Sequence, residues 1–160
     1  MKEISLKMYN KKEEIEYLSN TLKNYFYLKK KEKDLNQEIL NLDYKIENER
    51  LYINSSGTYD VIAGSGCSVN VPRPQSVNYL VEKQARYITE RDEVIKLYTS
   101  LDKDNRIIER LNKLSIEAQI IINNVYQRGL TITNIAKIEK VSKQTISNRL
   151  DRAHKELLRS

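Results

Sequence analysis

The sequence contains little of the chemistry that builds disulfides, metal centres or nucleophilic active sites. It has one cysteine, Cys67, one histidine, His154, and no tryptophan. A single cysteine cannot close a disulfide within the chain, and one cysteine with one histidine cannot supply the ligand cluster of a zinc site. Cys67 also has no partner base to activate its thiol. We therefore expect no metal, no cofactor and no catalytic residue, and hence no enzyme.

Residues that interrupt helices are also scarce, and they are concentrated in one place. Three of the four glycines and both prolines fall within residues 54–75. This composition is typical of a loop joining two long helical stretches. No uncharged stretch approaches the roughly 20 residues that span a bilayer, and the first residues lack the apolar core of a signal peptide. We expect a cytoplasmic protein without a membrane partner.

The stretches on either side of this loop, residues 1–53 and 76–113, show helical periodicity. Their apolar residues recur mostly at helical spacings, which predicts one long helix in each stretch, with a break near residues 100–104 of the second. The first apolar stripe consists of Ile15, Leu18, Leu22, Tyr25, Leu28, Leu35, Ile39, Leu42 and Ile46. The second consists of Val77, Leu80, Val81, Ala85, Ile88, Ile95, Tyr98, Leu101, Ile108 and Leu111.

These two stripes need a partner surface. Either helix alone would expose its stripe to water, so the two must pack together or on another copy of the chain. The heptad phase of residues 1–53 is irregular, which disfavours a long parallel coiled coil. We expect an all-α fold with a long helical hairpin within one chain, and a homodimer through the long helices as a weaker addition.

The formal net charge of +6 lies mostly at the C-terminal end. Residues 114–160 carry eight basic and four acidic side chains, whereas residues 1–113 carry 20 basic and 18 acidic ones. A local basic excess is the electrostatic footprint of a nucleic-acid-binding unit, so double-stranded DNA is the first partner to consider. The Lys29–Lys31 run has acidic neighbours and is better explained as a solvated helix face.

The C-terminal segment contains three short helix signals with very short connections. Ser115 can cap the first helix, Thr131 or Thr133 the second and Ser142 the third, and Gly129 can adopt a left-handed conformation. A helix, a tight turn and a capped helix predict a helix-turn-helix in residues 114–160. The expected core faces are Ile116, Ile120, Ile121 and Val125, then Ile132, Ile135 and Ala136, then Ile146, Leu150, Ala153 and Leu157.

In a helix-turn-helix the exposed start of the last helix enters the major groove of DNA. Lys can reach guanine acceptors, Gln and Asn can bond bidentately to adenine, and basic side chains nearby can neutralise phosphates. His154 is expected to be solvated or to touch a phosphate weakly. We predict base contacts from Lys143, Gln144, Ser147 and Asn148, phosphate contacts from Lys140, Arg149, Arg152 and Lys155, and further DNA-facing positions at Ser142 and Thr145.

The order of residues in this segment carries a family resemblance. Leu114, Val125, Tyr126, Gly129, Leu130, Ile135, Ala136, Val141, Ser142, Thr145, Ile146, Arg149, Leu150 and Ala153 occur in the order typical of region 4 of sigma-70-type factors. That region binds promoter DNA, and the resemblance makes RNA polymerase a further candidate partner. Lys140 stands where a turn glycine is usual and Asn134 where an acidic residue is, so Lys140 must tolerate a positive φ.

The loop carries a second resemblance. Tyr59-Asp60 is followed after three residues by Gly64-Ser65-Gly66, which is similar to the YDxxxGSG signature of phage RinA-like and ArpU-like regulators. Those are small proteins of Gram-positive phages and prophages with a helix, this loop, another helix and a sigma region 4-like end. The resemblance implies a transcriptional activator of late or packaging genes that is associated with the nucleoid of a bacterial host cell.

Two other functions stay open at this point. The chain could be a helical adaptor that binds RNA polymerase or a sigma factor and contacts DNA weakly. It could also be a phage small-terminase-like DNA-packaging protein. That class usually places its helix-turn-helix before its oligomerising helices, and the opposite order here counts against it.

Overall fold

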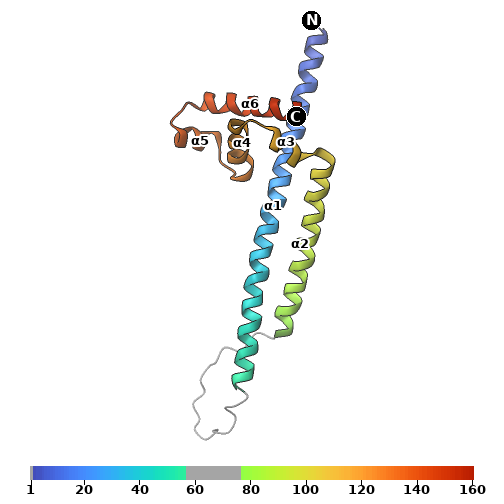
Figure 1. Ribbon diagram of the computed structural model, residues 1–160, viewed down its shortest axis with the longest axis vertical. Coiled ribbons are helices and arrows are strands. Elements are labelled where there is room, and N and C mark those ends of the chain that lie inside the picture. Colours follow the sequence, from blue (N-terminus) through green and yellow to red (C-terminus); the bar gives the residue numbers. More distant parts are fainter. Residues whose placement is uncertain (1, 57–76) are drawn as a thin grey trace. The chain divides into compact units, whose positions relative to one another are not determined.

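The computed structural model describes residues 2–56 and 77–160, with side chains described for residues 12–51 and 77–160, and all regular elements in these ranges are helices (Figure 1). The predicted all-α class is confirmed. Residues 54–56 of the predicted loop belong to the first helix, and the rest of the loop, including the Tyr59-Asp60 motif and Cys67, lies outside the described residues. The elements are α1 (Lys2–Ser56), α2 (Val77–Asn105), α3 (Ile107–Lys113), α4 (Ile116–Ile122), the π-helical turn η1 (Asn123–Gln127), α5 (Ile132–Glu139) and α6 (Lys143–Arg159).

The chain divides into two compact units, and both long helices contribute to each of them. The first unit combines Met1–Lys30 with Ile95–Ser160, and the second spans Lys31–Val94. The short helices α3 to α6 therefore share a unit with the N-terminal part of α1 and the last turns of α2.

In the second unit α1 and α2 pack side by side in opposite directions. Lys31 forms an ion pair with Glu90 at 2.7 Å. Further along α1, Asp43 accepts a hydrogen bond from the side-chain amide of Gln84. Later residues of α1 thus contact earlier residues of α2. The core of this unit gathers Leu42 and Ile46 of α1 with Leu80 of α2, and Val77 and Tyr87 pack against it.

Helical periodicity identifies most of the buried face of α1 but less of that of α2. In α2, Leu80 is buried as predicted, whereas Val81 and Ala85 are exposed and the buried Val94 was not in the predicted stripe. A helix that packs on one neighbour buries only a narrow line of residues, so a broad apolar stripe overestimates its core. In α1, Leu18, Leu22, Tyr25, Leu35, Ile39, Leu42 and Ile46 are buried, and Ile15 and Leu28 are half-buried.

The first unit has the larger core, and α1 helps to build it. The ring of Tyr25 meets that of Tyr98 edge-on, with centroids 6.1 Å apart. The Lys29 ammonium lies 4.4 Å from the centroid of the Tyr98 ring. Because α1 closes this core, we do not expect residues 114–160 to fold without it. The buried core residues are Leu18, Leu22, Tyr25, Ile107, Leu114, Ala118, Ile121, Ile122, Ile135, Ala136, Ile146, Ala153 and Leu157.

The second long helix predicted for residues 76–113 is divided in two at Arg106. This residue has a left-handed conformation with φ 52°, and the Asp102 carboxylate accepts a hydrogen bond from the Ile108 amide at 2.7 Å. The left-handed residue changes the helical phase, so that Ile107 is buried and Ile108 is exposed. The predicted burial of Ile108 is therefore wrong, and the break lies just after the predicted one.

The buried face of α4 also differs from the predicted one, because it is rotated around the helix axis. Ile121 is buried as expected, but Ile116 is 77 % exposed and Ile120 is 52 % exposed, while Ala118 and Ile122 are buried. Three consecutive isoleucines at positions 120–122 fit more than one helical phase. Packing of α4 against α6 selects the phase that buries the small Ala118.

This phase of α4 can be tested with one pair of matched substitutions. We expect Ile122→Ala to lower the free energy of unfolding by about 2–5 kcal/mol, because Ile122 is fully buried and its truncation leaves a cavity. Ile120→Ala makes the same change two residues away on an exposed face and should cost less than about 0.5 kcal/mol. Urea denaturation followed by circular dichroism measures both, and equal losses would contradict the assigned phase.

Candidate nucleic-acid interface

Hydrogen bonds fix both ends of α5, and a tight turn joins its C-terminal end to α6. The Thr131 hydroxyl caps α5 by accepting from the Asn134 amide at 3.2 Å. At the other end Lys140 adopts φ 56°, and the Val141 amide donates to the Ala136 carbonyl at 3.0 Å. This backbone pattern closes a helix C-terminus and usually uses glycine at the left-handed position. The predicted positive φ at Lys140 is confirmed, and Thr131 is the cap.

α6 starts immediately after this turn with a capped first turn. The Ser142 hydroxyl accepts from the Thr145 amide at 3.0 Å and lies 2.8 Å from the Thr145 hydroxyl. These bonds satisfy a free amide at the helix start. Both hydroxyls, which the sequence placed in the DNA-facing set, are therefore engaged in starting α6, and a DNA contact from either stays a prediction.

The apolar stripe of α6 determines which side of the helix faces outward. Ile146, Ala153 and Leu157 are buried and Leu150 is half-buried, as predicted. Since an α-helix has 3.6 residues per turn, the residues about half a turn away from this stripe lie on the opposite face. That outer face and the first turn carry the exposed residues Lys143, Gln144, Asn148, Arg152 and Lys155, with the half-buried Ser147 beside them.

Two amide side chains are paired on this outer face. Gln144 Nε2 donates a hydrogen bond to Asn148 Oδ1 at 3.0 Å, one helical turn further on. Each amide keeps further donor and acceptor capacity, because an amide carries two N–H donors and an oxygen with two lone pairs. Adenine presents one donor and one acceptor in the major groove, which is the pattern that such a group can match.

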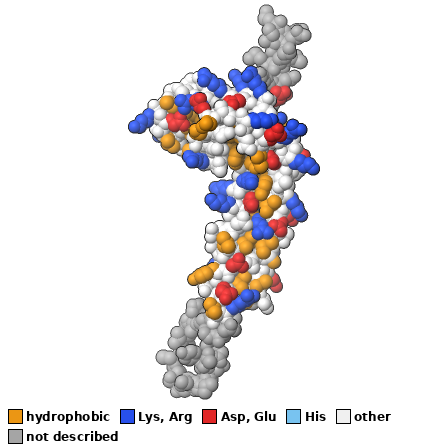
Figure 2. Space-filling model, in the orientation of Figure 1, with side chains coloured by type: hydrophobic (Ala, Val, Ile, Leu, Met, Phe, Trp, Pro, Cys, Tyr) orange, Lys and Arg blue, Asp and Glu red, His pale blue; other side chains and the backbone are white. Residues whose placement is uncertain are grey.

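Basic side chains flank the amide pair. Lys140 in the turn, Lys143 in the first turn of α6, and Arg152 and Lys155 further along are all exposed. Figure 2 shows Lys and Arg side chains projecting from the surface of the C-terminal helices. Exposed cations beside the amide pair are where the sequence predicts phosphate contacts, and such contacts stay a prediction.

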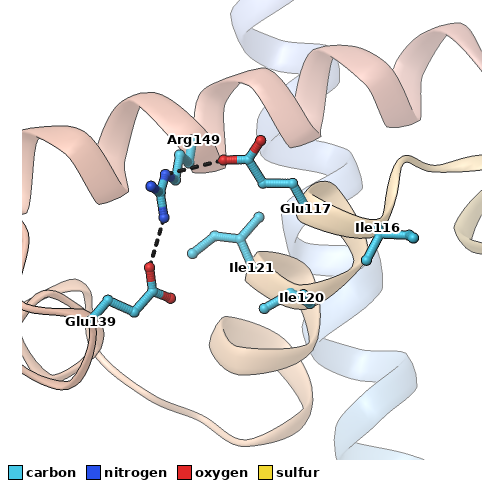
Figure 3. A pocket seen from close by; sticks show the side chains of 6 residues that line it. All are labelled: Ile116, Glu117, Ile120, Ile121, Glu139 and Arg149. Atoms are coloured by element: carbon cyan, nitrogen blue, oxygen red, sulfur yellow. Dashed lines mark hydrogen bonds and ion pairs between the residues drawn. The ribbon is translucent and has the colours of Figure 1, made fainter.

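Arg149 is placed differently from the other cations of α6. Its Nε lies 3.2 Å from a carboxylate oxygen of Glu117 in α4, and its Nη1 lies 2.7 Å from one of Glu139 in α5. Figure 3 shows the guanidinium held between the two carboxylates. A phosphate contact from Arg149, as the sequence predicted, would require these pairs to break. In this arrangement Arg149 positions α6 on α4 and α5.

The acidic side chains of the C-terminal segment are mostly used in such internal contacts. The Glu156 carboxylate accepts hydrogen bonds from the Ser115 backbone amide and, at 2.9 Å, from its hydroxyl, at the start of α4. Glu117 and Glu139 are paired with Arg149. Of the four acidic residues in this segment, only Asp151 has no such partner within the described part of the chain. The electrostatic field of the outer face of α6 is therefore dominated by its cations.

A pocket of about 510 Å³ opens beside Arg149 (Figure 3). The sequence placed Ile116 and Ile120 in the core, so this exposed apolar group was missed. Exposed apolar side chains around a hollow are typical of a contact with another protein rather than with DNA. The residues that line the pocket are Ile116, Glu117, Ile120, Ile121, Glu139 and Arg149.

His154 is buried, and the prediction that it is solvated is wrong. The side chain is 5 % exposed, and its Nε2 lies 2.7 Å from the Tyr126 hydroxyl, which lies 2.8 Å from the Ser19 hydroxyl. This polar chain connects α6 to η1 and α1. Its members are far apart in sequence, so periodicity gave no signal for it.

Burial also changes how these groups titrate. It lowers the pKa of His154, and the negative charge of Asp151 opposes this shift. Burial likewise raises the pKa of the Tyr126 hydroxyl. Nδ1 of His154 has no hydrogen-bond partner among the described residues. A protonated ring would place an N–H there without an acceptor, so the neutral form is the stable one.

The described residues give no sign of a metal centre or a membrane span. No group of three or more His, Cys, Asp or Glu in this part of the chain is placed to hold a metal ion. None of the described helices is both long and apolar enough to cross a membrane. Comparison with known protein families, curated proteins and solved structures finds no match for this chain.

The lowered pKa of His154 predicts a pH dependence of stability. An unfolded histidine binds a proton near pH 6.5, whereas the folded chain does so only at lower pH. The contribution of neutral His154 to the free energy of unfolding is therefore complete above about pH 6.5. As the pH falls below this value, the free energy of unfolding decreases by at most about 1.4 kcal/mol per pH unit. His154→Gln should flatten this loss, because His154 is the only histidine. Urea denaturation between about pH 5.5 and 7.5 measures it, and identical profiles of both proteins would refute the prediction.

Proposed function

We propose that the chain is a sequence-specific DNA-binding transcription regulator without catalytic activity. In this proposal α5, the turn at Lys140 and α6 act as a helix-turn-helix resembling sigma region 4, and α1 with α2 forms a hairpin within the chain. The observation that carries it is the outer face of α6, where the Gln144–Asn148 amide pair adjoins exposed cations. Amides for base edges and cations for phosphates are the two components of sequence-specific binding.

The geometry divides the predicted contact residues into two groups. Lys143, Gln144 and Asn148 lie at the exposed start of α6, where a recognition helix meets base edges. Ser147 is half-buried at the border of this surface. Phosphate contacts are assigned to Lys140, Arg152 and Lys155, because all three are exposed. We leave Arg149 out of the second group, since its guanidinium is paired with two carboxylates.

The biological setting comes from resemblance alone. The similarity of the loop motif to RinA-like and ArpU-like regulators supports an activator of phage or prophage genes. The similarity of residues 114–160 to sigma region 4 supports a contact with RNA polymerase during activation. The activation of phage genes and the contact with RNA polymerase during activation both require that α6 binds DNA.

Selection from a random duplex pool tests the proposed function. The full-length chain should retain a defined motif that includes adenine, and its affinity should fall steeply with added salt because cations on α6 displace counterions from phosphates. Sequencing of the retained fraction and binding titrations at several salt concentrations measure both. Uniform retention of all sequences would contradict a specific regulator and favour a packaging role.

Single substitutions on α6 separate base contacts from phosphate contacts on the selected motif. Gln144→Ala or Asn148→Ala should relax preference at one or two base pairs and cost about 1–3 kcal/mol of binding free energy. Arg152→Ala should weaken selected and random DNA alike and lower the salt slope by about 1. Lys103→Ala, which removes an exposed charge from α2, serves as the control and should change neither.

These variants can also show that α6 is docked differently. If both amide variants kept the selected motif and affinity while Arg152→Ala changed base preference, the proposed reading face would be wrong. Thermal melts of each variant establish that the fold is retained before binding is compared.

A helical adaptor that binds RNA polymerase or a sigma factor is the second candidate. The pocket beside Arg149, with its exposed Ile116 and Ile120, favours a protein contact in the first unit. In an adaptor, DNA binding should be weak and without sequence preference, and Ile116→Glu should abolish co-purification with RNA polymerase. A selected DNA motif with no polymerase binding would rule the adaptor out.

A further inference from the structure

The hydrogen bond between Gln144 and Asn148 makes the two side chains one group on the outer face of α6. Gln144 Nε2 donates to Asn148 Oδ1 at 3.0 Å, and neither side chain has another hydrogen-bond partner within the described part of the chain. The bond fixes the direction of the Asn148 amide, because Oδ1 faces Gln144 and Nδ2 is turned away from it. Asn148 therefore offers an acceptor and a donor in a fixed order.

The electrostatics at the start of α6 favour this direction of the bond. The first amides of a helix have no carbonyl partners within it, so they make the N-terminus positive. Lys143 adds an exposed cation there. Both attract the side-chain oxygen of Gln144 toward the start of α6, which leaves its N–H groups turned toward Asn148. If Asn148 donated to Gln144 instead, that oxygen would be turned away from these positive groups.

We propose that Asn148 reads one adenine and that Gln144 is the positioning residue that holds the Asn148 amide for this contact. The inference rests on the proposed binding of DNA by α6. In the major groove adenine presents a donor and an acceptor, N6 and N7, whereas guanine presents two acceptors, O6 and N7. The free lone pair and N–H of the held Asn148 amide match adenine, and its oxygen repels guanine O6.

Without Gln144 the Asn148 amide can adopt two orientations. A half-turn about its last side-chain bond exchanges the oxygen and the nitrogen, and the amide can then donate to guanine O6 or thymine O4. In water the bond to Gln144 favours one orientation by only about twofold. In a groove from which water is excluded, the reversed amide would leave donors of both residues facing each other, which costs more. Gln144 thus acts on base preference in the complex.

α1 carries a matched pair in the second unit, outside the proposed reading helix. Gln37 Nε2 donates to Asn41 Oδ1 at 3.2 Å. The spacing and the direction of the bond are the same as in α6, and both residues are exposed. The bond by itself is therefore no sign of DNA binding. Gln37→Ala removes an equivalent contact and serves as the control.

Affinities of the full-length chain for the selected duplex, with each base pair replaced in turn, test the positioning role. Asn148→Ala should lower the preference for adenine over guanine at one base pair by about fivefold or more. Gln144→Ala should lower it at the same base pair by about threefold. The double variant should equal Asn148→Ala within about twofold, because Gln144 acts only through Asn148. Gln37→Ala should change no base preference.

The outcomes separate this inference from the proposed function. Loss of preference at different base pairs in the two single variants would overturn the inference and leave a sequence-specific regulator. A double variant whose loss is the product of the two single losses, or a Gln37→Ala variant with the effect of Gln144→Ala, would do the same. If the wild-type chain selects no motif, the proposed function fails and the inference fails with it. Circular dichroism establishes that each variant remains folded.

Charged replacements of Gln144 test the direction of the bond. Gln144→Lys keeps a donor for Asn148 Oδ1 and should retain the wild-type adenine preference within about twofold. Gln144→Glu has only acceptors, so it should turn the N–H groups of Asn148 toward itself and lower this preference at least as much as Gln144→Ala. Each preference is a ratio of two affinities of one variant, so the general effect of the added charge cancels. Equal preferences of the two charged variants would overturn the positioning role.

Discussion

The burial of one side of α6 is the contact on which the proposed DNA surface depends. Ile146, Ala153 and Leu157 hold this side in the core of the first unit, and full burial of a large aliphatic side chain stabilises a fold by about 1.5–3 kcal/mol. Polar contacts then fix the rotation and position of the helix. Arg149 connects it to α4 and α5, and Glu156 connects it to the start of α4. The outward direction of Gln144 and Asn148 follows from these contacts.

The same contacts place most acidic side chains of the C-terminal segment between helices and leave most of its cations exposed. Three of the four acidic residues in the C-terminal segment are engaged in holding helices together, so its exposed cations have few acidic neighbours. The N-terminal part of α1 belongs to this arrangement. Ser19 completes the polar chain to His154 through Tyr126, and Leu22 lies in the shared core. α1 thus supports α6 in the first unit.

The sequence predicts local features of this fold better than contacts between distant residues. The caps at Ser115 and Ser142 and the left-handed Gly129 follow from local chemistry and are confirmed. The break at Arg106 has no glycine or proline to mark it. The three consecutive isoleucines at positions 120–122 do not indicate which face of α4 is buried.

The polar contacts of the candidate site escaped prediction for a different reason. The exposed face of α6 follows from periodicity, so Gln144 and Asn148 could be placed from the sequence. Arg149 meets Glu117 and Glu139, and His154 meets Tyr126, only after the helices have packed. The sequence therefore predicted a solvated histidine at position 154, where the fold buries one.

Photo-crosslinking to duplex DNA tests most directly which surface of the first unit touches DNA. A benzophenone amino acid would replace either Asn148, on the outer face of α6, or Ile120, on the exposed face of α4. After irradiation of the complex, the account predicts a covalent adduct from position 148 and none from position 120. An adduct from position 120 with none from position 148 would contradict the assignment of α6 as the DNA-reading helix.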